Sequence, residues 1–429
     1  MATIAAPISV SRESKILKLL SYAALFVLAL GGVASLLIRL GLGMKVTALT
    51  STVAWGAWVA IYIYFIGLSA GSFLLSALIY VFGMHRYEKV GRLALVSALF
   101  ALLGGMLFIW MDLGHPERFW RVFANWNITS VLAWEVLLYL LYAAIILAEL
   151  WLLMRYDLAA LAIENTGWRG LLYRSLALGF RPPKDHTESE AMQERGRKII
   201  KRLGIFGVPV AIGVHGGTGA IFAVVAAKPY WFSGLFPIIF IVSALASGAA
   251  LMTFLYAFFG KRDEQHKNTV RGLANLMVLF LGIDLLLLAS EYLVGLYGRI
   301  PEEIEVYRYI MFGPFWYTFW IGQLLLGAVL PILIVALPRT SKSTRWLGAA
   351  GLSAVLGIVA VRINLVIPAY VVPVLNGLNR AYLDKRWSYA YFPSPLEWAA
   401  SIGLVALLVL GFSFAFELLP MFAKEPESN

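Results

Sequence analysis

The 429-residue sequence contains no cysteine, and this absence restricts its chemistry. Disulfides, thiolate zinc sites and iron–sulfur clusters all need cysteine sulfur, so this chain cannot form them by itself. Histidine is also scarce, with five residues. Four of them are predicted to lie in or beside loops, namely His85, His115, His186 and His266. A b-type haem in a helical bundle usually needs two axial side chains on facing helices. Because His215 alone is expected to be buried, we predict no haem, iron–sulfur cluster or metal in this chain.

Charge is scarce as well. Only 14% of the residues are charged and 61% are hydrophobic, whereas an average soluble domain is about 25% charged. The net charge of +11 would suit nucleic acid if it formed a basic face on a soluble module. No such module is predicted, so we expect membrane lipid and no nucleic acid as a partner.

Ten long apolar runs follow one another along the chain. A helix needs roughly 20 apolar residues to cross a hydrocarbon core about 30 Å thick. The first run follows basic residues and has no A-x-A cleavage pattern after it, so it is predicted to be a retained span. The sequence therefore predicts an all-α polytopic membrane protein of about ten transmembrane helices. The predicted spans are residues 17–40, 55–83, 92–111, 129–154, 204–227, 233–259, 271–298, 313–337, 345–367 and 396–418.

The loops between these spans differ in charge. More than twice as many Lys and Arg residues fall on the side of the termini, from Arg12 to Lys424, as on the other side. Positive residues favour the cytoplasmic side, so both termini are predicted to be cytoplasmic. The segment 155–203 is predicted to be a solvated cytoplasmic loop between two helical halves.

Two glycine pairs have the G-x-x-x-G spacing, Gly67 with Gly71 and Gly213 with Gly217. Such pairs let helices approach closely, so we expect close packing at both.

Ionisable residues inside spans cost at least about 2.5 to 3.5 kcal/mol, so each needs a partner, a cavity or a function. Glu149 and Glu417 lie near cytoplasmic ends and are expected to snorkel or cap. The remaining ones are Asp112, Glu135, His215, Asp284, Glu291 and Arg362.

Most of these groups are predicted in the outer half, where one arginine, Arg362, could meet the carboxylates of Asp112, Glu135 and Glu291. His215 and Asp284 are expected to lie deeper, and Asp284 shares a helix face with Glu291. Two alternatives stay open from the residues alone. Asp112 either anchors its loop or acts directly, and Arg362 forms either a structural ion pair or part of a functional site.

A chain without a redox group cannot carry electrons far by itself. If it takes part in redox chemistry, its substrate must be a diffusible two-electron carrier in the membrane, and a partner must exchange the electrons. A quinone meets both conditions, with histidine or carboxylates handling the protons.

Four stretches resemble the NrfD/PsrC family of membrane quinone oxidoreductase subunits. The first two are FIGLSAGSFLLSALIYVFG at Phe65 to Gly83 and WMDLGHPERFWRVFANWNITS at Trp110 to Ser130. The other two, RINLVIPAY at Arg362 to Tyr370 and YFPSPLEWAASIGLVAL at Tyr391 to Leu407, are similar to the ten-span branch that includes HybB and DsrP.

The resemblance implies two four-helix bundles, within 55–227 and 233–367, with peripheral spans at 17–40 and 396–418. It also implies a prokaryotic cytoplasmic (inner) membrane and a haem-free site for an exchangeable quinone, expected to be menaquinone, near the outer face. The expected partners are a ferredoxin-like iron–sulfur subunit on that face and further catalytic or cytochrome subunits.

We therefore predict a quinone-reactive subunit of a respiratory oxidoreductase. His215, Glu135 and Asp112 are the candidate catalytic residues, and Trp110 joins them in binding the quinone. Asp284, Glu291 and Arg362 are assigned to a proton path or a structural ion pair. The alternative is a secondary transporter or an ion-translocating protein, which would require broken helices at matching positions of two inverted halves.

Overall fold

The computed structural model describes residues 12–422 except 184, 376, 383 and 385. Within these residues the chain is helical, and ten helices are long and apolar enough to cross a membrane, as predicted. These spans are α1 (Arg12–Leu42), α2 (Ala57–Tyr80), α3 (Glu88–Asp112), α5 (Val131–Glu164), α7 (His186–Ala223), α8 (Phe236–Phe259), α9 (His266–Gly298), η4 (Thr318–Val329) continued by α11 (Leu330–Ala336), α12 (Thr344–Val366) and α14 (Pro395–Leu418). Shorter helices are α4 (Arg121–Ala124), α6 (Gly167–Leu176), α10 (Pro301–Met311) and α13 (Pro368–Val371), with 3₁₀ turns η1 (Gly43–Val46), η2 (His85–Tyr87), η3 (Pro116–Arg118) and η5 (Leu378–Arg380).

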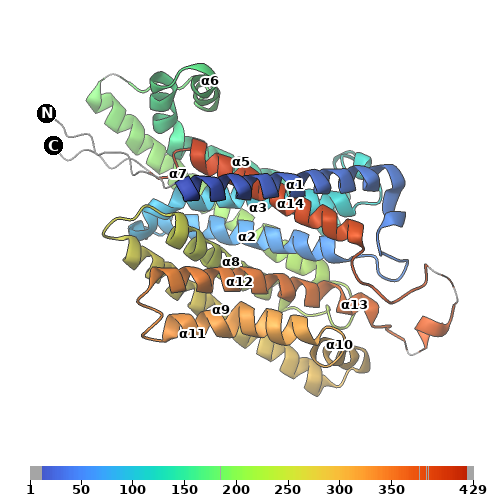
Figure 1. Ribbon diagram of the computed structural model, residues 1–429. Coiled ribbons are helices and arrows are strands. Elements are labelled where there is room, and N and C mark those ends of the chain that lie inside the picture. Colours follow the sequence, from blue (N-terminus) through green and yellow to red (C-terminus); the bar gives the residue numbers. More distant parts are fainter. Residues whose placement is uncertain (1–11, 184, 376, 383, 385, 423–429) are drawn as a thin grey trace.

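The spans form two neighbouring bundles, with α1 and α14 packed together beside the first (Figure 1). The first bundle contains α2, α3, α5 and α7, and the second contains α8, α9, η4 with α11, and α12. Helix α2 also packs on α8 and α12, so it lies at the junction of the bundles. This arrangement matches the two bundles and two peripheral spans that the family resemblance implies.

Glycine allows the bundles to meet closely. A Cβ atom on Gly71 of α2 would lie 1.8 Å from the carbonyl oxygen of Ala244, and one on Gly248 would lie 2.1 Å from the carbonyl carbon of Gly71. No side chain fits at either position, so close packing at Gly71 is confirmed. The expectation for Gly217 was wrong, because a Cβ atom there would meet nothing within 4 Å.

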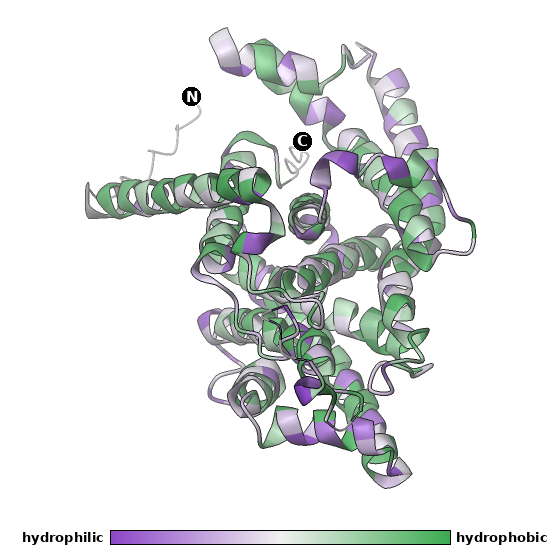
Figure 2. Ribbon diagram, turned by 90° about the vertical axis from the view of Figure 1, so that its right-hand side faces the viewer, coloured by the Kyte–Doolittle hydropathy of each residue, from purple (hydrophilic) through white to green (hydrophobic). Residues whose placement is uncertain are grey.

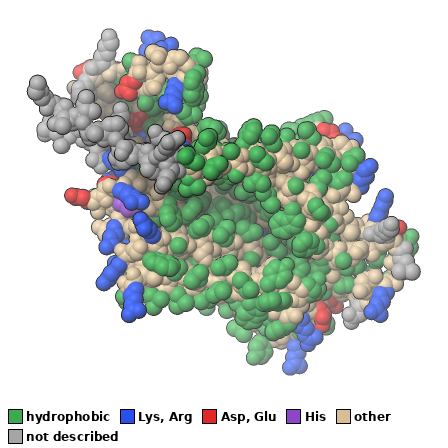
Figure 3. All heavy atoms as spheres, in the orientation of Figure 1, with side chains coloured by type: hydrophobic (Ala, Val, Ile, Leu, Met, Phe, Trp, Pro, Cys, Tyr) green, Lys and Arg blue, Asp and Glu red, His purple; other side chains and the backbone are tan. Residues whose placement is uncertain are grey.

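The start of α1 and the end of α14 lie at one end of the molecule, which we call the terminal side, and the loops after α1, α3, α7, α9 and α12 lie on the opposite side (Figure 1). Apolar residues dominate the long helices (Figure 2). The surface shows an apolar band, with basic side chains at both ends (Figure 3). Lys424, which contributes to the charge bias, lies outside the described residues.

The prediction that 155–203 is a loop was wrong for most of its length. Helix α5 continues to Glu164, α6 follows, and α7 already begins at His186. The carboxylate of Asp185 caps α7 by accepting a hydrogen bond from the Glu188 amide at 3.3 Å. Polar residues that favour helix extend these spans past the apolar runs, which apolar periodicity alone does not detect.

Candidate functional site

Glu135 is buried in the first bundle among hydroxyl groups. The Tyr139 hydroxyl donates a hydrogen bond to Glu135 Oε1 at 2.6 Å, and the Thr218 hydroxyl donates to the same oxygen. The Tyr62 and Tyr139 hydroxyl oxygens lie 2.5 Å apart. Since α5, α7 and α2 each supply a member, this cluster exists only in the folded bundle. Its connected hydroxyls can hold or pass a proton in an apolar interior.

His215 of α7 lies where the two bundles meet, and 1% of its surface is exposed. Its ring centre is 5.2 Å from that of Phe240 on α8. A Cβ atom on Gly67 of α2 would lie 3.2 Å from its Cε1 and Nε2 atoms. Among the described residues, neither ring nitrogen has a hydrogen-bond partner. The imidazole therefore keeps a free donor and a free acceptor inside the protein.

Arg362 of α12 is buried near His215. It donates from Nη2 to the Ser243 hydroxyl at 2.9 Å, and its guanidinium carbon lies 4.6 Å from the Phe240 ring centre. Asp284 of α9 is its electrostatic partner, although no carboxylate of the described chain forms an ion pair with it.

The expected meeting of one arginine with three carboxylates is therefore not what the fold contains. Asp112 lies on the other side of the first bundle, within electrostatic range of Arg39 on α1 and Glu397 on α14. Glu135 is held by hydroxyls, and Glu291 accepts from Ser233 Oγ at 3.0 Å. The order of the helices along the chain does not reveal which helix faces contact one another, so the expectation was wrong.

Asp112 ends α3, and its Oδ1 atom is buried without a hydrogen-bond partner among the described residues. Arg39 fixes the backbone around it by donating to the Met111 carbonyl at 2.9 Å and to the Leu113 carbonyl. The neighbouring Trp110 donates from its indole nitrogen to the Pro116 carbonyl at 3.1 Å. Arg39 and Trp110 thus anchor the loop, and they do so through backbone carbonyls rather than through the Asp112 carboxylate.

Sequence reasoning missed Arg39 and Glu397 as buried groups, since both were assigned to span ends. Glu397 accepts from the amides of Ala48 and Ser394, each at 2.8 Å, and from the Tyr391 hydroxyl at 2.7 Å. Burial raises the pKa of Tyr391, so its hydroxyl remains a donor. The motif Ser394-Pro-Leu-Glu397 forms a capping box, and this spacing was a sequence signal for Glu397.

An apolar groove lies between α1, α3 and α14. Its wall on α3 includes Trp110 and Met111, directly before Asp112, and its other walls stop one turn short of Arg39 and Glu397. Asp112, Arg39 and Glu397 therefore lie within one helical turn, along the chain, of residues that line the groove. The lining residues are Ala29, Gly32, Val33, Leu36, Leu107, Trp110, Met111, Ala400, Gly403, Leu404 and Leu407.

A chain of aromatic rings lies between Asp112 and His215. Trp231 lies 5.2 Å from Tyr370 and 5.0 Å from Phe222, measured between ring centres. Phe222 in turn lies 6.0 Å from Phe240, which packs on His215. Tyr370 is within electrostatic range of Asp112. These rings cover the candidate site on the opposite side.

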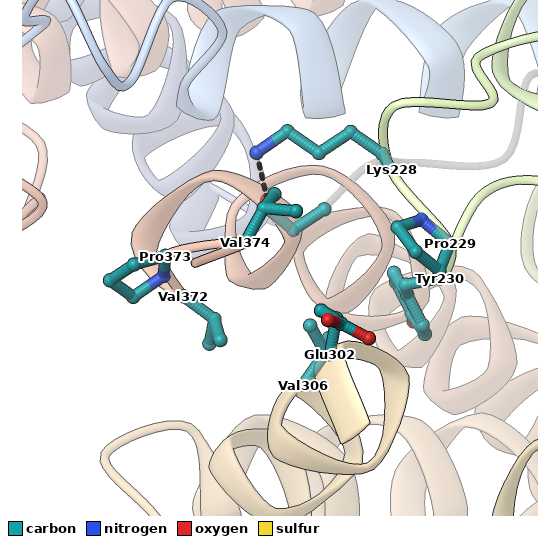
Figure 4. A pocket seen from close by; sticks show the side chains of 9 residues that line it. Lys228, Pro229, Tyr230, Glu302, Val306, Val372, Pro373 and Val374 are labelled. Carbon is teal, nitrogen blue, oxygen red and sulfur yellow. Dashed lines mark hydrogen bonds between the residues drawn. The ribbon is translucent and has the colours of Figure 1, made fainter. Parts of the chain in front are cut away.

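A small pocket lies beside this aromatic cover (Figure 4). Lys228 crosses it and donates to the Ala369 carbonyl at 2.7 Å, while Glu302 and Val306 of α10 form the far wall. Burial lowers the pKa of Lys228. The lysine thus ties the turn after α7 to α13.

The second bundle carries its own polar groups. Asn364 of α12 donates to Gln323 Oε1 at 2.8 Å and accepts from the Thr318 hydroxyl at 2.5 Å. Thr318 and Gln323 both belong to η4, which is π-helical, a form frequent at functional sites. Asp284 Oδ1 is buried and accepts no hydrogen bond from the described residues.

His266 corrects one expectation, because it is buried beside Tyr256 at the start of α9. Its Nδ1 atom is 3.1 Å from the Lys261 carbonyl oxygen. It begins α9 on the terminal side, whereas His215 lies towards the opposite side. In the described part of the chain no three His, Asp or Glu residues gather as metal ligands.

Comparison with known proteins identifies the family of the chain. The family profile described as "Polysulphide reductase, NrfD" matches residues 45–374, which include both bundles. The chain is 50% identical to a selenate reductase subunit of Mesobacillus selenatarsenatis, with 96% of each protein covered. It is 30% identical to the Hdr-like menaquinol oxidoreductase integral membrane subunit of Archaeoglobus fulgidus, covering 90% of this protein and 88% of that one. It is 25% identical to the protein NrfD of Escherichia coli, covering 71% and 91%. The chain is a multi-pass membrane protein of the NrfD family.

Proposed function

We propose that this protein is the quinone-reactive membrane subunit of a multi-subunit respiratory oxidoreductase. It oxidises a quinol, expected to be menaquinol, and delivers the electrons to an iron–sulfur partner. The observation that carries this proposal is His215, a buried imidazole with both nitrogens unpartnered among the described residues, at the junction of two bundles that also hold the hydroxyl-lined Glu135. Such unpaired polar groups inside a membrane protein favour a ligand or proton role.

These residues and the partner together account for the protons and electrons of quinol oxidation. Oxidation of a quinol to a quinone releases two electrons and two protons. His215 and Glu135 accept protons in turn, since a neutral imidazole and a carboxylate each take one. Tyr139 and Thr218 orient the Glu135 carboxylate through their hydrogen bonds. The electrons pass to the partner because this chain has no cysteine for a cluster.

The apolar groove is the proposed entrance for the quinol. An isoprenoid tail suits its walls of Leu, Ala and Gly, and Asp112 at its end offers a carboxylate oxygen to a quinol hydroxyl. Trp110 forms the wall beside that carboxylate. Asp112 thus binds the arriving headgroup at the entrance, and the headgroup then has to move past the aromatic rings before His215 and Glu135 take the protons.

Asp284, Arg362 and Glu291 are proposed to serve a proton path or to stabilise the second bundle. Asp284 lies within electrostatic range of Arg362, and Arg362 within range of His215. The positive charge of Arg362 would repel a proton bound to His215. The imidazole would therefore release that proton more readily.

The relatives' names support the rest of the assignment. One relative is a selenate reductase subunit and another a menaquinol oxidoreductase subunit. We propose that the partner complex reduces an oxyanion and that the electrons flow from quinol to it. The positive-inside bias favours cytoplasmic termini. The family resemblance adds a prokaryotic inner membrane and an iron–sulfur partner on the outer face to the proposal.

A transporter is not favoured by the shape of the spans. Helices α2, α3, α8, α9 and α12 run unbroken in the described chain, and Pro209 lies within a continuous α7. Unwound midplane segments in paired spans, which transporters use, are not among the described spans.

The decisive experiment replaces His215 by Leu and Glu135 by Gln, one at a time, in the assembled complex. We expect quinol-linked turnover to fall about a hundredfold or more in each, while reduction of the terminal acceptor by a dye that feeds the partner directly stays unchanged. His266→Leu is the matched control, a buried histidine at the other end of the bundles. Full quinol turnover in both test variants would remove this site from the reaction.

A further inference from the structure

Helix α6 stands outside both bundles on the terminal side (Figure 1). It is tied to the end of α14, because the Tyr173 hydroxyl donates to the Leu418 carbonyl at 3.1 Å. The helix therefore lies at the level where the spans end, beside the bundles.

Residues on both sides of α6 fix the orientation of this helix. Gly167 begins the helix at a φ of +67°, which glycine adopts readily, and so sets its angle to α5. After the helix, the Phe180 ring packs under the Arg155 guanidinium at 4.8 Å. Ala177, which lies between the end of α6 and Phe180 in the chain, is buried. The faces of α6 therefore have definite directions.

One face of α6 contacts the protein and the other is apolar and uncovered. Gly170 and Tyr173 are buried. On the other face Trp168 is 64% exposed and Leu171 68% exposed. The flanking Leu178 is 75% exposed, so the apolar surface continues past the helix. Large apolar side chains turned away from the protein need a nonaqueous surface to cover them.

Two arginines flank this apolar face at the helical period, Arg169 on one edge and Arg174 on the other. Arg169 lies within electrostatic range of Glu417. Arg174 is exposed and has no ion-pair partner among the described residues. Basic side chains beside an apolar face are complementary to a surface that is both apolar and anionic.

We propose that α6 is an interfacial helix that binds anionic phospholipid. Trp168 and Leu171 enter the boundary between headgroups and acyl chains, and Arg174 binds the phosphate of a headgroup, with Arg169 beside it. Trp and Leu on one face with arginine at its edge is the composition of helices that lie in a membrane surface.

The position of α6 favours lipid over a protein partner. Apolar side chains of this protrusion lie on the edge next to the apolar band of the spans, with basic side chains nearby (Figure 3). A bilayer around that band would reach α6 without any further subunit. The terminal side also carries most of the basic residues, which anionic lipids attract.

The absence of cysteine makes a clean test possible. Leu171→Cys carries a nitroxide spin label in the full-length protein, reconstituted in vesicles of phosphatidylcholine or of the same lipid with roughly a quarter phosphatidylglycerol. Collision with oxygen reports lipid, and collision with a water-soluble nickel chelate reports water. Gln193→Cys, exposed on the extension of α7, is the matched control. Quinol turnover of each variant in the assembled complex confirms that it is folded.

We expect the ratio of oxygen to nickel collisions at position 171 to exceed that at 193 severalfold, and more so with phosphatidylglycerol. Adding Arg174→Gln should remove most of the phosphatidylglycerol effect, about fivefold for one arginine. Free access of the nickel chelate to position 171 would overturn the proposal. Exclusion of both reagents in the native complex would assign the face to a protein partner instead, and equal ratios in both vesicle types would overturn the anionic preference.

Discussion

His215 of the first bundle and Arg362 of the second both pack against Gly67 of α2. A Cβ atom at this glycine would lie 3.2 Å from His215 Cε1 and 3.7 Å from Arg362 Nη2. A buried imidazole and a buried guanidinium from different bundles thus face one position that has no side chain.

Gly67→Ala should therefore impair the quinol reaction. The added methyl group is too close to the imidazole, so His215 must shift by a few tenths of an ångström, and turnover should fall about tenfold. Helix propensity alone would make the change stabilising by up to about 1 kcal/mol. Gly217→Ala is the control, since its methyl group meets open space. Unchanged quinol turnover in Gly67→Ala would mean that the position of His215 does not matter.

Tyr139→Phe removes the hydroxyl that links Glu135 to Tyr62. We expect a loss of about 1 kcal/mol in unfolding free energy, because one buried hydrogen bond disappears, together with slower quinol turnover. Tyr142→Phe on the same helix removes the hydrogen bond to the Ser69 carbonyl, 2.9 Å long, away from Glu135.

Thermal unfolding in detergent and quinol turnover separate the two effects. Both variants should lose similar stability, but only Tyr139→Phe should lose activity. Equal activity losses would show that the hydroxyls act through packing alone.

The pair of Lys89 and Asp263 should stabilise the protein in a pH-dependent way. Lys89 Nζ lies 2.6 Å from Asp263 Oδ2, and this hydrogen bond holds the pKa of Asp263 below its ordinary value. The lowered pKa means that the stabilisation is complete above the ordinary carboxyl value near 4, and is lost as pH falls through the lowered value. Asp263→Asn should thus cost at most about 1 kcal/mol at pH 7.

The stability difference between Asp263→Asn and the native protein should shrink in acid, below about pH 4. Unfolding midpoints over the pH range measure it. Glu305→Gln, which breaks an exposed pair with Arg308, should show no measurable change at any pH. A difference that grows in acid would contradict the assignment.

The electron-transfer partner should dock on the opposite side, over the segments 112–128, 299–312 and 368–395. A photoreactive cross-linker on Trp126→Cys, which is exposed beside Trp134, should capture an iron–sulfur protein from the native complex. The same linker on Gln193→Cys of the terminal side should not. Capture from position 193 alone would reverse the orientation proposed for the partner.

Much of the fold could be predicted because each span carries its own signal. Twenty apolar residues in succession are sufficient to define a membrane helix, and the resemblance at Trp110 to Ser130 supplied the family. Helix ends were less accurate, as at α7, which begins at His186 rather than near residue 204. Its first turns are polar and are capped by Asp185, so no apolar pattern indicates them.

The candidate site was only partly predictable. The buried ionisable groups stand out in the sequence, since few occur within apolar runs, and they include Glu135 and His215. Their hydrogen-bonding neighbours do not stand out in the sequence, because Tyr62, Thr218 and Ser243 are ordinary residues of a span until the helices pack.

The apolar runs alone make this protein a helical membrane protein, because hydrophobic length is a property of each segment. The lack of cysteine also means that cysteine-ligated redox groups must belong to a partner. Packing of the helices, by contrast, places Asp112 beside Arg39 and Glu397, Arg362 near His215, and α6 outside the bundles at the terminal side. Those relationships depend on which helix faces meet, and that is set by packing between segments far apart in the chain, such as Gly71 against Gly248.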